Sequence, residues 1–267
     1  MSYFKKGSLF SDNDGFSDPR MMRPVSVMNK KNNSTHLLQP IETIQSDKNE
    51  ISFFKPNIVA LFANIANQEL KSAKTIYNES IHSKISQSGK IDFKKEEHNL
   101  LFDYFEKVQM SIVAIYTAVE AFANIAIPND YKIEKRNSKN IIEIWEKENI
   151  ERWINTSEKI SDILPSILNV ISPKKLKIWS YFKSLENIRN DIIHPKATSG
   201  SKKIDMNFLN KLLKENIFKT VESGFGIIQY FCQKDNLHPF FPMGFSDVLI
   251  QTIELDDFEE YFEINDN

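Results

Sequence analysis

Between residues 57 and 234, apolar residues recur at alternating three- and four-residue steps over most of the chain. This is the period of a helix with one buried face. The pattern predicts long helices over residues 57–77, 95–127, 172–194 and 205–234, and shorter helices over 141–153 and 157–170. The fold class that follows is all-α, an up-and-down helical bundle whose central helix covers residues 95–127, where the apolar surface is widest.

The two ends of the chain lack this helical period. Residues 1–50 mix Gly, Pro, Ser, Asn, Asp and Lys, a composition that predicts a mostly disordered tail. We expect the bundle to occupy residues 51–235 and an acidic C-terminal extension to occupy 236–267. A short β-like run at 248–255 leaves open whether this extension pairs with another strand.

One predicted helix combines a strong apolar stripe with a cluster of polar side chains. Ser172-Pro173 predicts its start, and Pro195 disfavours helical geometry at His194, so His194 is the last helical or first non-helical residue. At 100° per residue from the stripe, Arg189 lies at roughly 40°, Glu186 at about 100°, Asn190 at about 140° and His194 at about 180°. The stripe consists of Ile178, Tyr181, Leu185, Ile188 and Ile192.

This polar flank has two interpretations. It is either a functional cluster or a surface cluster in which Glu186 and Asp191 pair with Arg189 while His194 caps the helix C-terminus. The second arrangement is common wherever an arginine precedes a histidine by a few residues, because short motifs have many chance matches.

The full string LENIRNDIIHPK resembles the signature of the HEPN superfamily, helical domains found in many prokaryotic toxin and defence proteins. That signature is Arg, four to six residues, then His, with Asn, Asp or His usually following the Arg. Here the gap is four and the following residue is Asn190. The resemblance implies a metal-independent endoribonuclease whose site forms where two copies meet, with Arg189 and His194 catalytic and Asn190 orienting.

The residue types suit that chemistry. Cleavage of RNA without a metal requires a base for the 2′-hydroxyl, an acid for the leaving oxygen and positive charge beside the phosphorane. Histidine can exchange a proton near neutral pH, and arginine keeps its charge and offers paired donors to phosphate. One chain supplies a single motif histidine, so a two-fold homodimer would provide both proton-transfer partners.

Three carboxylates are candidate supporting residues, namely Glu120, Glu186 and Asp191. Glu120 belongs to a polar line with Thr117 and Asn124 inside the otherwise apolar stretch 95–127. It could orient Arg189 or His194, or it could simply lie at a solvated helix edge. The sequence leaves both possibilities open.

Charge is distributed unevenly along the chain. Residues 173–203 hold eight basic and two acidic residues, a local charge of +6 in a chain of −2, which suits RNA, although such runs are often merely solvated. Besides Arg189, the basic residues are Lys174, Lys175, Lys177, Lys183, Lys196, Lys202 and Lys203. Residues 247–267 carry eight acidic residues and no basic ones, so they could cover that basic face or form a solvated tail.

The amino-acid composition excludes several classes of binding site. Seven glycines among 267 residues argue against phosphate-cradling loops, and the single Cys232 excludes zinc sites built on paired cysteines. The five histidines show no shared-metal spacing, so we expect neither a metal nor a cofactor. No stretch is typical of a membrane span, and we expect a cytoplasmic protein. The rivals to a nuclease are a non-catalytic HEPN-like module that binds a nucleotide, RNA or protein, and an antitoxin-like interaction protein.

Overall fold

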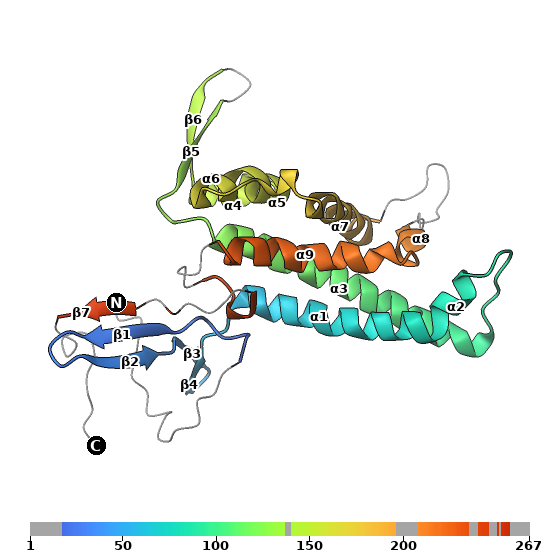
Figure 1. The fold of residues 1–267 in the computed structure, drawn as a ribbon, viewed down its shortest axis with the longest axis horizontal. Helices are drawn as coiled ribbons and strands as arrows, with labels where there is room; N and C mark the ends of the chain where they lie inside the picture. The colour runs from blue at the N-terminus through green and yellow to red at the C-terminus, as the bar shows by residue number, and fades with distance from the viewer. Residues whose placement is uncertain are drawn as a thin grey trace. The chain divides into compact units, whose positions relative to one another are not determined.

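The computed structural model describes residues 18–136, 140–195, 208–234, 240–245, 250 and 252–256. The chain divides into two compact units (Figure 1). One unit contains residues 61–230, and the other combines residues 1–60 with 231–267.

The unit of residues 61–230 is largely helical. Its longest helix, α3, lies at the centre of the packing, with several side chains that have no exposed surface. The helices are α1 (Ile58–Ile76), α2 (His82–Ile85), α3 (His98–Ile125), α4 (Lys147–Trp153), α5 (Thr156–Glu158), α6 (Leu164–Leu168), α7 (Ile178–Ile193), α8 (Phe208–Leu212) and α9 (Asn216–Cys232), with π-helical turns at Tyr77–Ile81 and Lys159–Ile163 and 3-10 turns at Lys95–Glu97 and Pro173–Lys175.

The predicted helices over residues 57–77 and 95–127 are confirmed by α1 and by α3 with its preceding 3-10 turn. The stretch Lys95–Ile125 is also long and apolar enough to cross a membrane by composition alone. Just over half of its most apolar window is buried among the other helices, as in the central helix of a globular core.

The predicted helix over residues 141–153 is wrong in its first half. Strands β5 (Lys132–Arg136) and β6 (Ile142–Glu146) form a hairpin that extends away from the helices (Figure 1), and only α4 is helical. Along β6 the residues alternate between exposed and half-buried, as in a strand, but Ile144 and Trp145 are adjacent apolar residues, so the sequence itself shows no clear period of two. At the open end of the hairpin, Lys132 and Glu146 lie directly opposite each other and form an ion pair of 2.6 Å.

The predicted helix over residues 157–170 is divided at Pro165. Proline has no N–H to donate to the carbonyl of Ser161, four residues before it. The Ser172 hydroxyl donates to that carbonyl instead, at 2.5 Å. A π-helical turn at Lys159–Ile163 precedes the proline, so the chain keeps its direction while its hydrogen-bond pattern changes.

The last predicted helix, over residues 205–234, is broken between α8 and α9. Two tyrosines from other helices bind the carbonyls at this break. The Tyr104 hydroxyl donates to the carbonyl of Leu212, and the Tyr77 hydroxyl donates to that of Leu213 at 3.2 Å. Carbonyls at the end of a helix lack partners within it, so these two bonds satisfy groups that would otherwise be buried and unpaired.

Helix α7 is rotated relative to the predicted stripe. Leu185 and Ile188 are buried as expected, but Tyr181 is 36% exposed and Phe182 takes its place in the core. The Phe182 ring stacks on Tyr116 of α3, with 6.2 Å between the ring centroids. Consequently the flank that carries Glu186 and Arg189 faces α3.

The unit that combines the two ends of the chain is built from strands. It contains a three-stranded sheet in the order β2-β1-β7 and a separate hairpin of β3 and β4. Strand β1 pairs antiparallel with β2, with Val27 opposite His36, and parallel with β7, with Val27 opposite Ile253. These strands are β1 (Val25–Asn29), β2 (Ser34–Leu38), β3 (Ile41–Ser46), β4 (Asn49–Phe54) and β7 (Thr252–Leu255).

The predicted disordered tail is therefore wrong for residues 18–50, and residues 1–17 lie outside the described residues. Val25 and Val27 are buried against Leu38 and Leu255, which gives the sheet a small core of its own. Asn33 and Asp47 adopt positive φ angles of 55° and 51° in the two hairpin turns, a conformation that these two residue types tolerate. The fold class is mixed α and β rather than all-α.

Strand β7 also answers the question left open for the C-terminal extension, because it pairs with β1. Lys30 forms ion pairs with Glu254 at 3.5 Å and with Asp256 at 3.4 Å. The sequence assigned the two ends to separate tails, whereas their described parts share one sheet. An acidic cover stays a prediction for residues 257–267, which lie outside the described residues.

Candidate catalytic cluster on helix α7

Helix α7 ends within the motif. His194 is the C-cap residue, with φ −121° and ψ 66°, and its backbone N–H donates to the carbonyl of Asn190 at 2.9 Å. Pro195 follows and has no N–H with which to continue the helix. The predicted position of His194 is confirmed, and its side chain is exposed.

Arg189 lies on an aromatic ring. Its guanidinium carbon is 5.1 Å from the centroid of the Tyr116 ring on α3, and Tyr116 is buried. An Nη atom of Arg189 donates to the Asn190 side-chain oxygen at 3.2 Å. Its Nε is buried and has no hydrogen-bond partner among the described residues. The ring and the amide together fix the guanidinium, since a cation over a desolvated aromatic face is attracted by about 1–2 kcal/mol.

Glu186 binds hydroxyl groups and a lysine rather than Arg189. Its carboxylate accepts hydrogen bonds from the Tyr116 hydroxyl at 3.0 Å and the Ser157 hydroxyl at 2.8 Å, and it forms an ion pair with Lys183. Burial alone would raise the pKa of Glu186, but the hydrogen bonds from Lys183 and Ser157 lower it overall. Glu186 is therefore held ionised beneath the ring that supports Arg189.

Asp191 is also directed elsewhere, toward Lys211 of α8 at 2.8 Å. The surface-cluster interpretation, in which Glu186 and Asp191 pair with Arg189, is thus wrong in its partners. Among the described residues, no carboxylate lies within ion-pair distance of Arg189. The guanidinium therefore keeps N–H groups that could donate hydrogen bonds to a phosphate oxygen.

The sequence did not identify Tyr116 as part of this site. Tyr116 fits the apolar period of residues 95–127 and was assigned to the core, where its ring does stack on Phe182. Burial is the main reason that the pKa of its hydroxyl is raised, with the nearby Glu186 charge second. It therefore stays protonated and donates to Glu186, while its ring face supports Arg189.

The polar line on α3 lies close to the same cluster. Glu120 interacts electrostatically with both Tyr116 and Lys159, which places it one turn beyond the ring. Lys159 is 2% exposed and donates to the Asn124 side-chain oxygen at 2.7 Å and to the carbonyl of Glu151 at 2.8 Å. Burial lowers the pKa of Lys159, and Glu120 and Glu151 oppose that shift. A supporting role for Glu120 stays a prediction.

The predicted RNA-binding lysines fall into three groups. Lys174 pairs with Asp162 at 2.8 Å and Lys183 pairs with Glu186, so these two charges are largely neutralised. Lys175 and Lys177 are exposed, and among the described residues neither is within ion-pair distance of a carboxylate. The positive field of the segment is therefore weaker than its formal charge suggests. Lys196, Lys202 and Lys203 lie outside the described residues.

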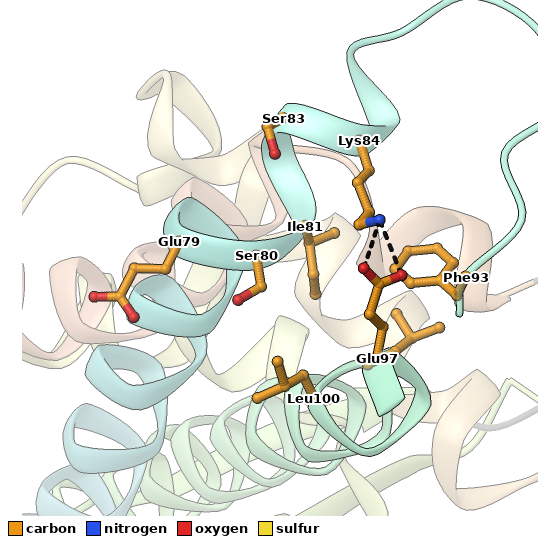
Figure 2. A pocket seen from close by; sticks show the side chains of 9 residues that line it. Glu79, Ser80, Ile81, Ser83, Lys84, Phe93, Glu97 and Leu100 are labelled. Atoms are coloured by element: carbon orange, nitrogen blue, oxygen red, sulfur yellow. Dashed lines mark hydrogen bonds and ion pairs between the residues drawn. The ribbon is translucent and has the colours of Figure 1, made fainter. Parts of the chain in front are cut away.

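A separate pocket of about 270 Å³ lies near the start of α3, beside the π-helical turn at Tyr77–Ile81 (Figure 2). Lys84 and Glu97 form an ion pair of 2.9 Å across it, and the Lys84 ammonium is 5.6 Å from the centroid of the Phe93 ring. The two opposite charges satisfy each other, and this pocket contains none of the motif residues.

Within the described ranges, no three His, Cys, Asp or Glu side chains are grouped so that they could hold a metal ion. Comparisons with protein-family models, curated proteins and solved structures found no match to this chain. A functional assignment therefore depends on the residues of the cluster and on their geometry.

Proposed function

We propose that this protein is a metal-independent endoribonuclease in which Arg189, Asn190 and His194 act on the phosphodiester. The observation that carries the proposal is the state of Arg189, whose guanidinium is fixed on the Tyr116 ring without a carboxylate partner among the described residues. Arg189 is half-buried, and its buried Nε has no hydrogen-bond partner among the described residues, although buried polar atoms are normally hydrogen-bonded. An arginine fixed in this way, five residues before an exposed histidine, is suited to binding an anion.

Each residue has a role in the proposed reaction. His194 exchanges the proton of the 2′-hydroxyl or of the leaving 5′-oxygen, because an imidazole nitrogen can either accept or donate a proton. The terminal nitrogens of Arg189 donate to the non-bridging phosphate oxygens, whose negative charge increases in the transition state. Asn190 holds the guanidinium through its side-chain oxygen and so limits its rotation. Glu186 acts indirectly, by fixing Tyr116.

The proposed assembly is a homodimer in the cytoplasm. One chain supplies a single motif histidine, whereas transfer of two protons is served best by two. Pairing of two copies about a two-fold axis would bring both His194 side chains to one RNA strand. A mass measurement in solution tests this part of the proposal. The HEPN-like motif further suggests a toxin–antitoxin or anti-phage role, with a cognate antitoxin or defence protein as partner.

The proposal is tested by cleavage of total RNA with purified variants. His194→Ala and Arg189→Ala should each lower the cleavage rate at least a hundredfold, since removal of one acid–base or charge-stabilising group typically costs about 10² to 10⁴. Asn190→Ala should have a smaller effect. Thermal melting should show that the variants remain folded.

Two matched controls separate the site from general effects of charge. His98→Ala removes another exposed histidine, and Arg152→Ala removes another arginine that lies over an aromatic ring, at 4.8 Å from the Trp153 centroid. Both controls should cleave RNA like the wild type. If the wild type binds RNA but leaves it intact under all conditions, the protein is a non-catalytic binding module instead.

A further inference from the structure

A polar groove of about 440 Å³ lies between α7 and the segment that joins α8 to α9. Its α7 wall includes Tyr181, Ser184 and Asn187, which follow one another at three-residue steps. Its other wall includes Lys211, Lys214 and Asn216. Among the residues that the structure describes, no acidic side chain lines it. The groove is thus hydrophilic and carries positive charge only.

The two lysines are held differently. The Lys211 ammonium is fixed by Asp191 at 2.8 Å, and Asp191 does not itself line the groove. Lys214 is exposed, and no carboxylate among the described residues lies within ion-pair distance. Helix α9 begins at Asn216, so the positive end of its dipole also faces the groove. These features favour an anion, chiefly at Lys214 and the start of α9, because the pairing with Asp191 weakens the charge of Lys211 as the pairing with Asp162 weakens that of Lys174.

The α7 wall offers groups that bind bases. Tyr181 keeps 36% of its surface exposed although it occupies a position in the apolar stripe, and every base can stack on an aromatic face. The Ser184 hydroxyl donates to the carbonyl of Ser180 at 3.0 Å, which leaves its oxygen as an acceptor. Asn187 is exposed, and its amide can donate to and accept from the edge of a base.

The groove is connected to the catalytic cluster through α7. It follows the helix for about two turns, from Ser180 to Ile188. Asp191, which fixes Lys211, lies three residues before His194. A strand that occupies the groove would therefore approach the end of α7 where the motif lies.

We infer that this groove binds a single-stranded nucleic acid, with phosphates on Lys211 and Lys214 and a base on Tyr181. The inference rests on the proposed function, because it assigns a binding site for the substrate strand. It differs from the +6 segment predicted by the sequence, since two of its anchors lie on α8 and the loop that follows.

The test measures binding and leaves cleavage aside. Fluorescence anisotropy with a labelled 2′-deoxy oligonucleotide avoids cleavage through a 2′-hydroxyl, and the same sequence as RNA is used with His194→Ala protein. Lys211→Ala/Lys214→Ala should weaken binding at least tenfold at low salt. It should also reduce the slope of log affinity against log salt by about 0.7 for the phosphate contact of Lys214, and by less for Lys211, which is already paired with Asp191. Tyr181→Leu should weaken binding roughly tenfold with little change of slope.

Lys90→Ala/Lys95→Ala is the matched control. Lys90 is paired with Asp92, as Lys211 is with Asp191, whereas neither Lys95 nor Lys214 is within ion-pair distance of a carboxylate among the described residues. The affinity of this control variant for the oligonucleotide should stay within about twofold of the wild-type affinity. Lys214→Ala alone breaks no ion pair of the fold, so its effect on binding does not depend on the stability of α8.

The inference is overturned if the groove variants bind like the control, or if inorganic phosphate competes as strongly as an unlabelled oligonucleotide of equal phosphate concentration. The latter result would indicate a site for a single anion. If nucleic acid binds through the groove but RNA is never cleaved, the proposed nuclease function is contradicted while the assignment of the groove is supported. If the groove variants cleave RNA as fast as the wild type, the assignment of the groove is contradicted while the nuclease function is supported.

Discussion

At the scale of single residues, the proposed site depends on the contacts of Tyr116 on α3 with Arg189 and Glu186 on α7, which no local sequence pattern could reveal. Arg189, Asn190 and His194 were predicted from their spacing on one helix, and the helix end falls where Pro195 requires it. Tyr116 was missed because it fits an apolar stripe and its partner Glu186 lies 70 positions away. One of the two interpretations paired Glu186 with Arg189, its neighbour on the same helix, whereas in the fold Glu186 contacts Lys183, Ser157 and Tyr116.

Substitution of Tyr116 should separate its two contacts. Tyr116→Phe keeps the ring beneath Arg189 and loses the hydrogen bond to Glu186, so cleavage should fall only a few fold. Tyr116→Leu loses both, and a desolvated cation–π contact of about 2 kcal/mol corresponds to a loss of roughly thirtyfold. Single-turnover cleavage rates measure this. Equal rates for the two variants would mean that the ring does not position Arg189.

Glu186 should cause the free energy of unfolding to decrease as the pH falls. Its folded pKa lies below its ordinary value of 4.5, so its contribution is present above that value and is lost as the pH falls through the folded pKa. Glu186→Gln removes this titration. Chemical unfolding from pH 6 downward should therefore show a steeper loss of unfolding free energy for the wild type than for the variant. Parallel curves would contradict the assignment of a stabilised carboxylate.

At the scale of elements, strong apolar periods were sufficient for α1 and α3. They also gave the end of α7, but its predicted start at Ser172-Pro173 was wrong, because those residues cap a separate 3-10 turn at Pro173–Lys175 and α7 begins at Ile178. The break between α8 and α9 follows from the hydroxyls of Tyr77 and Tyr104, which reach it from other helices. Strand β6 alternates between exposed and half-buried residues over only five positions and was hidden beside the helical period of α4. Gly224 and Gly226 lie within α9, inside the apolar helical pattern predicted for residues 205–234.

Those glycines predict a difference between two otherwise similar substitutions. A Cβ at Gly224 would lie 2.5 Å from Cγ1 of Ile115 and 3.2 Å from Leu185, in the packing of α9 on α3 and α7. A Cβ at Gly226 would meet mainly the Cδ1 terminus of Ile178, which can rotate away. Gly224→Ala should destabilise by about 1–2 kcal/mol after the gain in helix propensity, and Gly226→Ala should be near neutral. Denaturant unfolding compares them, and the opposite order would be inconsistent with this packing.

At the scale of the whole molecule, the main error was to treat both ends of the chain as tails. Strand β1 alternates buried and half-buried residues over only five positions, and its partner β7 lies more than 220 residues away, so neither strand is evident alone. An all-α class followed naturally from the long helices and missed the sheet. The helical unit was predicted more completely because the contacts that form each helix are local in sequence.

Deletion of β7 should show that strand β1 depends on its pairing with β7. A chain that ends at Leu249 loses the parallel pairing with β1 and the contact of Leu255 with Val25 and Val27. Val27 should then become accessible, and hydrogen exchange at β1 should accelerate while α3 keeps its protection. Substitution of Glu254 and Asp256 by Gln and Asn keeps the strand and is the matched control. Unchanged exchange in β1 of the truncated chain would contradict the pairing.

The most direct test of the proposed chemistry uses one synthetic RNA with and without a single 2′-deoxy nucleotide at the cleaved position, in the presence of EDTA. The all-ribose strand should be cut and leave a 2′,3′-cyclic phosphate or 3′-phosphate and a 5′-hydroxyl, because the 2′-hydroxyl is the proposed nucleophile. The strand with the deoxy nucleotide should stay intact at that position. Cleavage at the deoxy position, or products with 3′-hydroxyl ends, would contradict a mechanism built on Arg189 and His194.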